Sequence, residues 1–196
     1  MTIYGITGQT GAGKSTVLGV FASMGAYILD CDRVYWEILE SDTALQGELC
    51  EAFGDISAES GVIDRKKLGA VVFSSTESLE LLNEITHPYV LAKVEEKIKE
   101  AKAASYEIVA IDAISLIESG LAHGCHYVFA VVSPEETRIK RIMTRDGISY
   151  DYARNRAKAQ KNEAFYQENA NAVLNNHSDQ KDDFEKYVQS FLKKYV

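Results

Sequence analysis

The feature that most constrains this chain is a glycine-rich stretch near its start. Residues 8–15, GQTGAGKS, match the pattern G-x-x-x-x-G-K-[ST] in full. The preceding run TIYGIT at 2–7 is short, apolar and β-branched, as in a strand, and Val17, Phe21 and Met24 recur after it at helical spacing. Because the pattern binds phosphate when it lies between a strand and a helix, the chain is predicted to begin with a phosphate-binding loop.

The fixed positions of this loop predict how it holds a nucleoside triphosphate. Gly8 and Gly13 allow the backbone to turn tightly, so that its N–H groups face phosphate oxygens at a helix N-terminus. Lys14 is expected to reach the β- and γ-phosphates, and the Ser15 hydroxyl is a candidate ligand of Mg²⁺. The whole segment is predicted to bind ATP: Gly8, Gln9, Thr10, Gly11, Ala12, Gly13, Lys14, Ser15 and Thr16.

Apolar runs along the rest of the chain predict an α/β fold. Runs at 26–29, 107–111 and 127–132, and a weaker one at 172–174, are nearly continuous, as in strands that are buried on both faces of a parallel sheet. We expect five parallel strands with helices on both faces, closed by an amphipathic helix near the C-terminus. Residues 42–104 contain no convincing strand and are expected to form several helices, broken near Gly54 and Gly61, with the last one opening at Thr86-His87-Pro88.

Acidic residues stand where two of the predicted strands end. Asp30 and Asp32 follow the second strand, and Asp112 ends the third. Ligands bind beyond the carboxyl ends of strands in open α/β sheets, so Asp32 is a candidate general base and Asp112 a candidate ligand of Mg²⁺, directly or through water. Each acid has an alternative role as a helix cap or turn residue, and one of the first pair is expected to cap while the other faces the loop.

A basic segment interrupts an otherwise acidic chain. The net charge is −8, so nucleic acid is not an expected partner, yet residues 138–161 carry eight basic residues and two acidic ones. The segment is predicted to be a lid of two helices around Arg145-Asp146-Gly147. Arg141 and Arg145 lie four residues apart on one helical face and are the candidates for phosphate contact; solvated helix surface is the alternative for each.

Several classes of protein are not expected from the composition. No apolar run reaches the ~18 residues of a membrane span, and the N-terminus lacks the basic start and apolar core of a secretion signal. Cys31, Cys50 and Cys125 show no metal-binding spacing and are read as buried thiols in a reducing cytoplasm.

Beyond the loop, an ordered set of motifs resembles the dephospho-CoA kinases, P-loop enzymes of the nucleoside-monophosphate-kinase type. The set comprises DCD at 30–32, FG at 53–54, GVIDRKKL at 61–68, LNEITHP at 82–88, RDG at 145–147, Gln160 and ANAVLNN at 170–176. The resemblance implies ATP- and Mg²⁺-dependent phosphorylation of the ribose 3′-hydroxyl of dephospho-CoA, giving coenzyme A. The sequence departs from the family pattern at residues 114–116, where a family proline is missing, and at Glu168 and Asn171.

The resemblance also implies an architecture and residue roles. A single domain, 1–196, would combine a nucleotide-binding core (1–40 and 105–196), a helical acceptor-binding subdomain (about 60–104) and the lid (about 138–161). Asp32, Lys14 and Arg145 would be catalytic, and the acceptor would contact Thr7, Asp32, Arg65, His87 and Asp112.

Two other functions stay open from the residues themselves. The same core could phosphorylate another small molecule, nucleoside or nucleotide, or could bind a nucleotide without catalysis. In each case we expect small-molecule partners, no membrane, and a monomer or small homo-oligomer.

Overall fold

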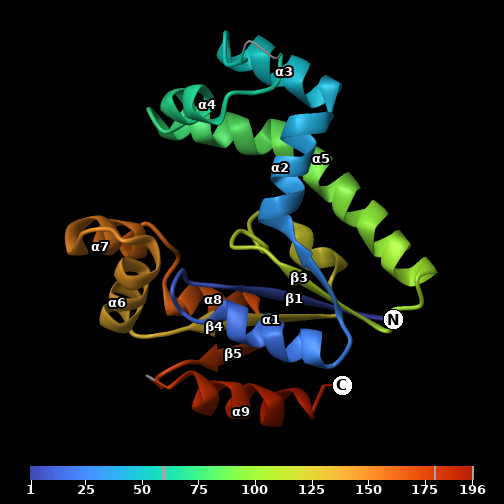
Figure 1. The fold of residues 1–196 in the computed structure, drawn as a ribbon, viewed down its shortest axis with the longest axis vertical. Helices are drawn as coiled ribbons and strands as arrows, with labels where there is room; N and C mark the ends of the chain where they lie inside the picture. The colour runs from blue at the N-terminus through green and yellow to red at the C-terminus, as the bar shows by residue number, and fades with distance from the viewer. Residues whose placement is uncertain (59–60, 179, 196) are drawn as a thin grey trace. The chain divides into compact units, whose positions relative to one another are not determined.

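A five-stranded parallel sheet organises the computed structural model, which describes residues 1–58, 61–178 and 180–195 (Figure 1). The strand order is β2-β3-β1-β4-β5, so the N-terminal strand is the central one. The strands are β1 (Thr2–Gly8), β2 (Tyr27–Asp30), β3 (Ile108–Asp112), β4 (Tyr127–Val132) and β5 (Ala172–Asn175). The predicted fold class is confirmed, with strand ends within one residue of the apolar runs.

Most of the helices lie where the sequence predicted them; one start was misplaced, and the short helices at 121–124 and 163–169 were not predicted. The helices are α1 (Lys14–Ser23), α2 (Cys31–Ser41), α3 (Thr43–Phe53), α4 (Arg65–Val72), α5 (Thr76–Ala103), the short 3-10 helix η1 (Leu121–Gly124), α6 (Glu135–Asp146), α7 (Tyr150–Lys158), α8 (Glu163–Asn169) and α9 (Lys181–Leu192). Gly54 ends α3 and Gly147 ends α6, both with positive φ, where glycine is favoured. These glycines stop the helices where the sequence predicted.

The prediction that a helix opens at Thr86 is wrong. α5 runs without a break from Thr76 to Ala103, with Pro88 inside it. Thr86 is buried and its hydroxyl donates to the carbonyl of Leu82, four residues earlier, at 2.8 Å. The threonine is therefore bonded back along the helix instead of capping it. Pro88 removes one backbone donor and makes a kink expected, and the ribbon of α5 changes direction along its length (Figure 1).

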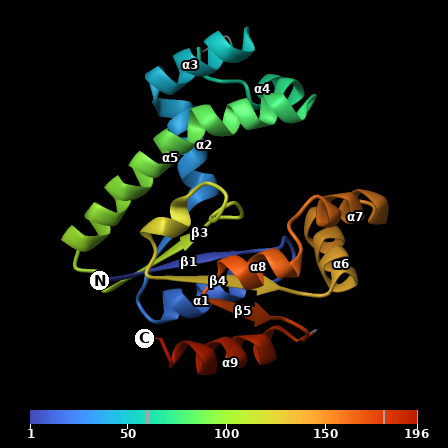
Figure 2. The ribbon, with the colours of Figure 1, turned by 180° about the vertical axis from the view of Figure 1, so that it is seen from behind.

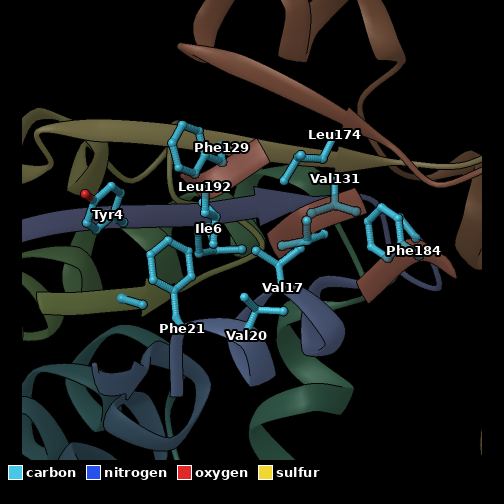
Figure 3. Close-up of a cluster of buried hydrophobic side chains, with 13 residues drawn as sticks. Tyr4, Ile6, Val17, Val20, Phe21, Phe129, Val131, Leu174, Phe184 and Leu192 are labelled. Atoms are coloured by element: carbon cyan, nitrogen blue, oxygen red, sulfur yellow. The ribbon is translucent and has the colours of Figure 1, made fainter. Parts of the chain in front are cut away.

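The chain forms two compact units: Met1–Leu29 with Ala101–Val196, and Asp30–Glu100. In the first unit, α1 and α9 cover one face of the sheet, and their apolar side chains meet those of the strands in one buried cluster (Figure 3). Tyr4, Val17, Phe21, Phe129 and Val188 belong to this cluster. The Tyr4 hydroxyl donates to the carbonyl of Tyr195 at 2.7 Å, so the central strand is tied directly to the C-terminal end of the chain.

The other face of the sheet is covered by α8 (Figure 2), whose Tyr166 packs on Ala130 and Val132. α6 and α7 pack on each other through a small cluster of their own, which includes Ile139, Ile142, Ala153 and Ala157. The two-helix lid predicted at 138–161 is thus a helical pair in the structure; its movement over a ligand stays a prediction.

The second unit is helical throughout its regular elements. α2, α3, α4 and α5 bury one apolar side each, with Ile38, Leu45, Leu68 and Val94 among the buried residues. Polar contacts join the helices at the surface: Lys97 pairs with Glu37 at 2.9 Å, and the Tyr89 hydroxyl donates to Glu48 at 2.6 Å. That hydrogen bond raises the pKa of Tyr89 to about 12.

Candidate active site

The phosphate-binding loop connects β1 to α1 through a path that only glycine fits at two places. Gly8 has φ 127°, and a Cβ atom there would lie 2.1 Å from the carbonyl oxygen of Val131 in β4. Gly13 has φ 111°, and a Cβ atom there would lie 2.6 Å from Nδ2 of Asn176. Both the backbone conformation and the close neighbours therefore exclude a side chain, which is the physical reason for glycine at these motif positions.

Several amides of the loop are left available for a ligand. The N–H groups of Gln9, Thr10 and Ala12 donate within the protein, to the carbonyl of Val131, the side chain of Gln160 and the carbonyl of Gln9. The N–H groups of Gly11, Gly13 and Ser15 have no hydrogen-bond partner among residues 1–58, 61–178 and 180–195. Because they lie at the N-terminus of α1, where the helix dipole favours negative charge, the geometry of the loop is suited to bind an anion.

Residues far along the chain hold this loop in shape. The Asn176 side chain, buried beyond the end of β5, donates to the carbonyl of Ala12 at 2.7 Å. Gln160 forms two bonds with Thr10, accepting from its N–H at 2.7 Å and donating to its hydroxyl at 2.6 Å. From the sequence, Asn176 and Gln160 were noted only as parts of the motifs that resemble the family, and no role was predicted for either. A polar residue just past a strand end was the available signal for Asn176.

Arg141 contacts the loop through the loop's carbonyl groups. Its Nη1 donates to the carbonyl of Gly11 at 3.1 Å, and its Nη2 donates to that of Ser178 at 2.7 Å. Arg141, which was predicted to contact ATP, therefore lies at the loop and stabilises the loop backbone.

The predicted metal ligands lie in the same unit as the loop. Ser15 is exposed in the first turn of α1, and Asp112 ends β3, where it is the register partner of Ile6 in β1. The ammonium group of Lys14 lies 3.5 Å from the carbonyl oxygen of Gly8. The described residues contain no cluster of three or more His, Cys, Asp or Glu side chains suited to a metal. One hydroxyl and one carboxylate fit Mg²⁺ that is held mainly by phosphates and water.

Thr7 lies at the end of β1, fully buried. Its hydroxyl donates to the carbonyl of Ile114 at 2.9 Å. This bond anchors the segment after β3 in which the family's proline is missing.

Arg145 is exposed at the end of α6 and is held by its neighbour. Its Nε and Nη2 donate to the two carboxylate oxygens of Asp146 at 2.7 and 3.0 Å, and Arg156 of α7 reaches the same carboxylate at 2.6 Å. The guanidinium group of Arg145, and to a smaller extent that of Arg156, lowers the pKa of Asp146 to about 2. α6 and α7 therefore hold two arginines around one carboxylate.

The remaining predicted residues lie in the second unit. Asp30 caps α2, accepting from the N–H of Arg33 at 3.1 Å, and Asp32 is exposed in the first helical turn. Arg65 contacts α2, where it pairs with Glu40 at 2.6 Å. His87 is half-buried in α5, and burial lowers its pKa, so its imidazole is neutral at pH 7. Of the two acids, Asp30 and Asp32, one was expected to cap the helix and the other to face the loop. The cap is confirmed at Asp30.

Comparisons with known proteins agree on one family. A family model described as dephospho-CoA kinase matches residues 2–182. A dephospho-CoA kinase of Carboxydothermus hydrogenoformans is 38% identical over 161 residues, covering 82% of this chain and 78% of that protein. One from Corynebacterium jeikeium is 36% identical over 176 residues, covering 90% and 91%.

The solved structures agree on the fold. A crystal structure of a Thermus thermophilus protein superimposes with a TM-score of 0.80 at 30% identity, covering 100% of this chain and 98% of that one. In the part of the chain that the structure describes, no helix is both long and apolar enough to cross a membrane.

Proposed function

This chain belongs to the dephospho-CoA kinase family, and from that premise we propose which residues perform the reaction. The protein transfers the γ-phosphoryl group of ATP to the ribose 3′-hydroxyl of dephospho-CoA, giving coenzyme A and ADP. The observation that carries the assignment of residues is the loop with three available amides at the N-terminus of α1.

The loop and Lys14 hold the triphosphate. The amides of Gly11, Gly13 and Ser15 point to phosphate oxygens, while Lys14, drawn across the loop toward the carbonyl of Gly8, neutralises charge on the β- and γ-phosphates. These contacts act without reorganisation because Asn176 and Gln160 fix the loop beforehand. Arg141 is proposed as a further ATP ligand at the edge of this loop.

Ser15 and Asp112 would hold Mg²⁺, Ser15 through its hydroxyl and Asp112 directly or through water. Bound there, the ion neutralises the charge that develops on the phosphates during transfer. Oxygen ligands of this number suit Mg²⁺, which keeps most of its coordination for phosphate and water.

Asp32 is proposed as the general base. Its carboxylate accepts the proton of the 3′-hydroxyl as that oxygen forms its bond to the γ-phosphorus, while the bond from phosphorus to the bridging oxygen of ADP breaks. Asp32 lies in the first turn of α2, and a helix N-terminus favours negative charge. The proposal requires Asp32 to face the acceptor hydroxyl in the ternary complex.

Arg145 is proposed to exchange its partner during the reaction. In the structure Asp146 occupies its planar fork of donors, and the transferred phosphoryl group would take that place as the lid, about 138–161, closes. On the acceptor side we propose Thr7, Arg65, His87 and the helical segment of about 60–104.

An acceptor panel tests the reaction itself. Purified protein with ATP and Mg²⁺ is expected to phosphorylate dephospho-CoA and to leave nucleosides, shikimate and gluconate unchanged. Robust turnover of another acceptor without turnover of dephospho-CoA would overturn the assignment.

A matched pair of substitutions tests the base. Asp32→Asn is expected to lower kcat by about 10²–10⁴-fold and to leave ATP affinity unchanged. Asp30→Asn is the control two residues away, because asparagine caps helices as well as aspartate; its kcat should stay near that of the unaltered protein. Full activity of Asp32→Asn would remove the role given to Asp32.

A further inference from the structure

The exposed face of α2 carries three residues at four-residue intervals. Asp32, Trp36 and Glu40 are all exposed, while the opposite side of the helix is buried. Residues four apart on a helix lie on one face, with about 6 Å between successive positions along the axis. The proposed base, an indole ring and a second carboxylate therefore form one row.

Arg65 lies on this row. Its guanidinium carbon is 4.0 Å from the centroid of the Trp36 ring, and its Nη2 donates to Oε1 of Glu40 at 2.6 Å. Its backbone is also fixed, because Arg65 begins α4 directly after the cap Asp64, whose carboxylate accepts two N–H groups. Backbone, ring and carboxylate together set the plane of the guanidinium group.

This arrangement orients Arg65 more than it stabilises the fold. The side chains of Arg65 and Glu40 are 48% and 61% exposed, and ion pairs so open to water contribute little to stability. Glu40 takes one of the five N–H donors of the guanidinium group. Within the described parts of the chain, the others have no hydrogen-bond partner. A guanidinium of fixed plane with unused donors is suited to bind phosphate by paired hydrogen bonds.

We propose that Trp36 is a positioning residue for the acceptor: it holds the guanidinium group of Arg65 so that Arg65 binds the diphosphate of dephospho-CoA. The 5′-diphosphate and the 3′-hydroxyl belong to the same ribose, and Trp36 lies one helical turn from Asp32 on the same face. Binding the diphosphate at Arg65 would thus place the hydroxyl toward the base. This inference rests on the general-base role proposed for Asp32 and on dephospho-CoA as the acceptor.

Fluorescence tests the contact without any turnover. Trp36 is the only tryptophan in the chain, so emission excited where tyrosine does not absorb reports on this site alone. Addition of dephospho-CoA is expected to change the emission in a saturable way, and adenosine, which lacks the diphosphate, is expected not to. The blank is Trp36→Phe, which has no signal. An emission that dephospho-CoA leaves unchanged, or that adenosine changes equally, would overturn the inference.

Kinetics test the positioning role. Trp36→Leu is expected to raise KM for dephospho-CoA about fivefold, equivalent to about 1 kcal/mol, with kcat and KM for ATP within about twofold. Trp36→Phe keeps a ring face and should recover most of the affinity. Tyr187→Leu is the matched control, since Tyr187 is an aromatic residue 44% exposed in α9, outside the acceptor segment and the lid, and its KM should not change.

Two results would separate the inference from the function beneath it. In the first, the unaltered protein phosphorylates dephospho-CoA, and the Trp36→Leu protein keeps the same KM while circular dichroism shows that it is folded. This result refutes the positioning role and leaves the proposed function standing. If the unaltered protein fails with dephospho-CoA and acts on another acceptor, the proposed function falls and this inference falls with it.

Discussion

Replacing Gly8 by alanine puts the geometry of the loop to a direct test. The new Cβ would lie 2.1 Å from the carbonyl oxygen and 2.6 Å from the nitrogen of Val131. Both are backbone atoms of the neighbouring strand, which cannot turn away as a flexible side chain can. The substitution therefore forces β1 and β4 apart at the point where the loop begins.

The cost of Gly8→Ala has two parts. Holding an alanine at φ 127° costs about 1–3 kcal/mol in backbone strain, and relieving the overlap with β4 costs about 1–3 kcal/mol more. The expected loss is therefore about 2–6 kcal/mol, a large share of the roughly 5–15 kcal/mol of a typical domain. ATP affinity should fall as well, because the loop amides move with the backbone.

Gly19→Ala is the matched control for the same chemical change. Gly19 is exposed in the interior of α1, and a Cβ atom there would meet nothing within 4 Å. Alanine should raise the free energy of unfolding by about 0.5–1 kcal/mol. Urea unfolding of both variants measures the two changes, and calorimetric titration with ATP measures affinity. A Gly8→Ala protein that matches the unaltered one in both assays would refute the reasoning about the loop.

Three further outcomes follow from single contacts. Arg145 and Arg156 keep the pKa of Asp146 near 2, so their pairing stabilises the α6–α7 pair above about pH 4 and is lost as pH falls through about 2. In acid titrations followed by circular dichroism, Asp146→Asn should lack that step. Asn176→Ala removes one of the two donors to the carbonyl of Ala12 and leaves Arg141 as the other; this should cost about 0.5–1.5 kcal/mol in urea unfolding and raise KM for ATP. Burial raises the pKa of Cys125 to about 11, so its alkylation by iodoacetamide, followed by mass spectrometry, should be slow at pH 8 and accelerate about tenfold per pH unit; a rate like that of a free thiol would contradict its burial.

Local signals in the sequence were enough to predict the sheet and several helix ends. Continuous apolar runs mark strands buried on both faces, and Gly54 and Gly147 mark helix ends because the backbone there has positive φ. The start of α5 was mispredicted because the prediction relied on local composition alone. A threonine before a proline has the composition of a helix start, and only packing decides that Thr86 lies inside a longer helix.

The phosphate-binding motif of the candidate site could be predicted from the sequence, but the distant residues that hold the loop in shape could not. Lys14 and the loop glycines follow from spacing, because the chemistry fixes their order along the chain. The residues that hold the loop, Asn176 and Gln160, are separated from it by about 150 residues or more, and no periodicity reports such contacts. The stacking of Arg65 on Trp36 is of the same kind, since it joins two helices that the sequence does not pair.

The order of the strands has a consequence for how the chain folds as it is synthesised. β1 leaves the ribosome first, yet its two neighbours in the sheet are β3 and β4, which begin at Ile108 and Tyr127. Asp30–Glu100 is one continuous segment, so all of it has been translated before β1 can acquire a partner on either side. The unit that contains the sheet must therefore assemble late, because its central strand is synthesised well before either of its neighbours.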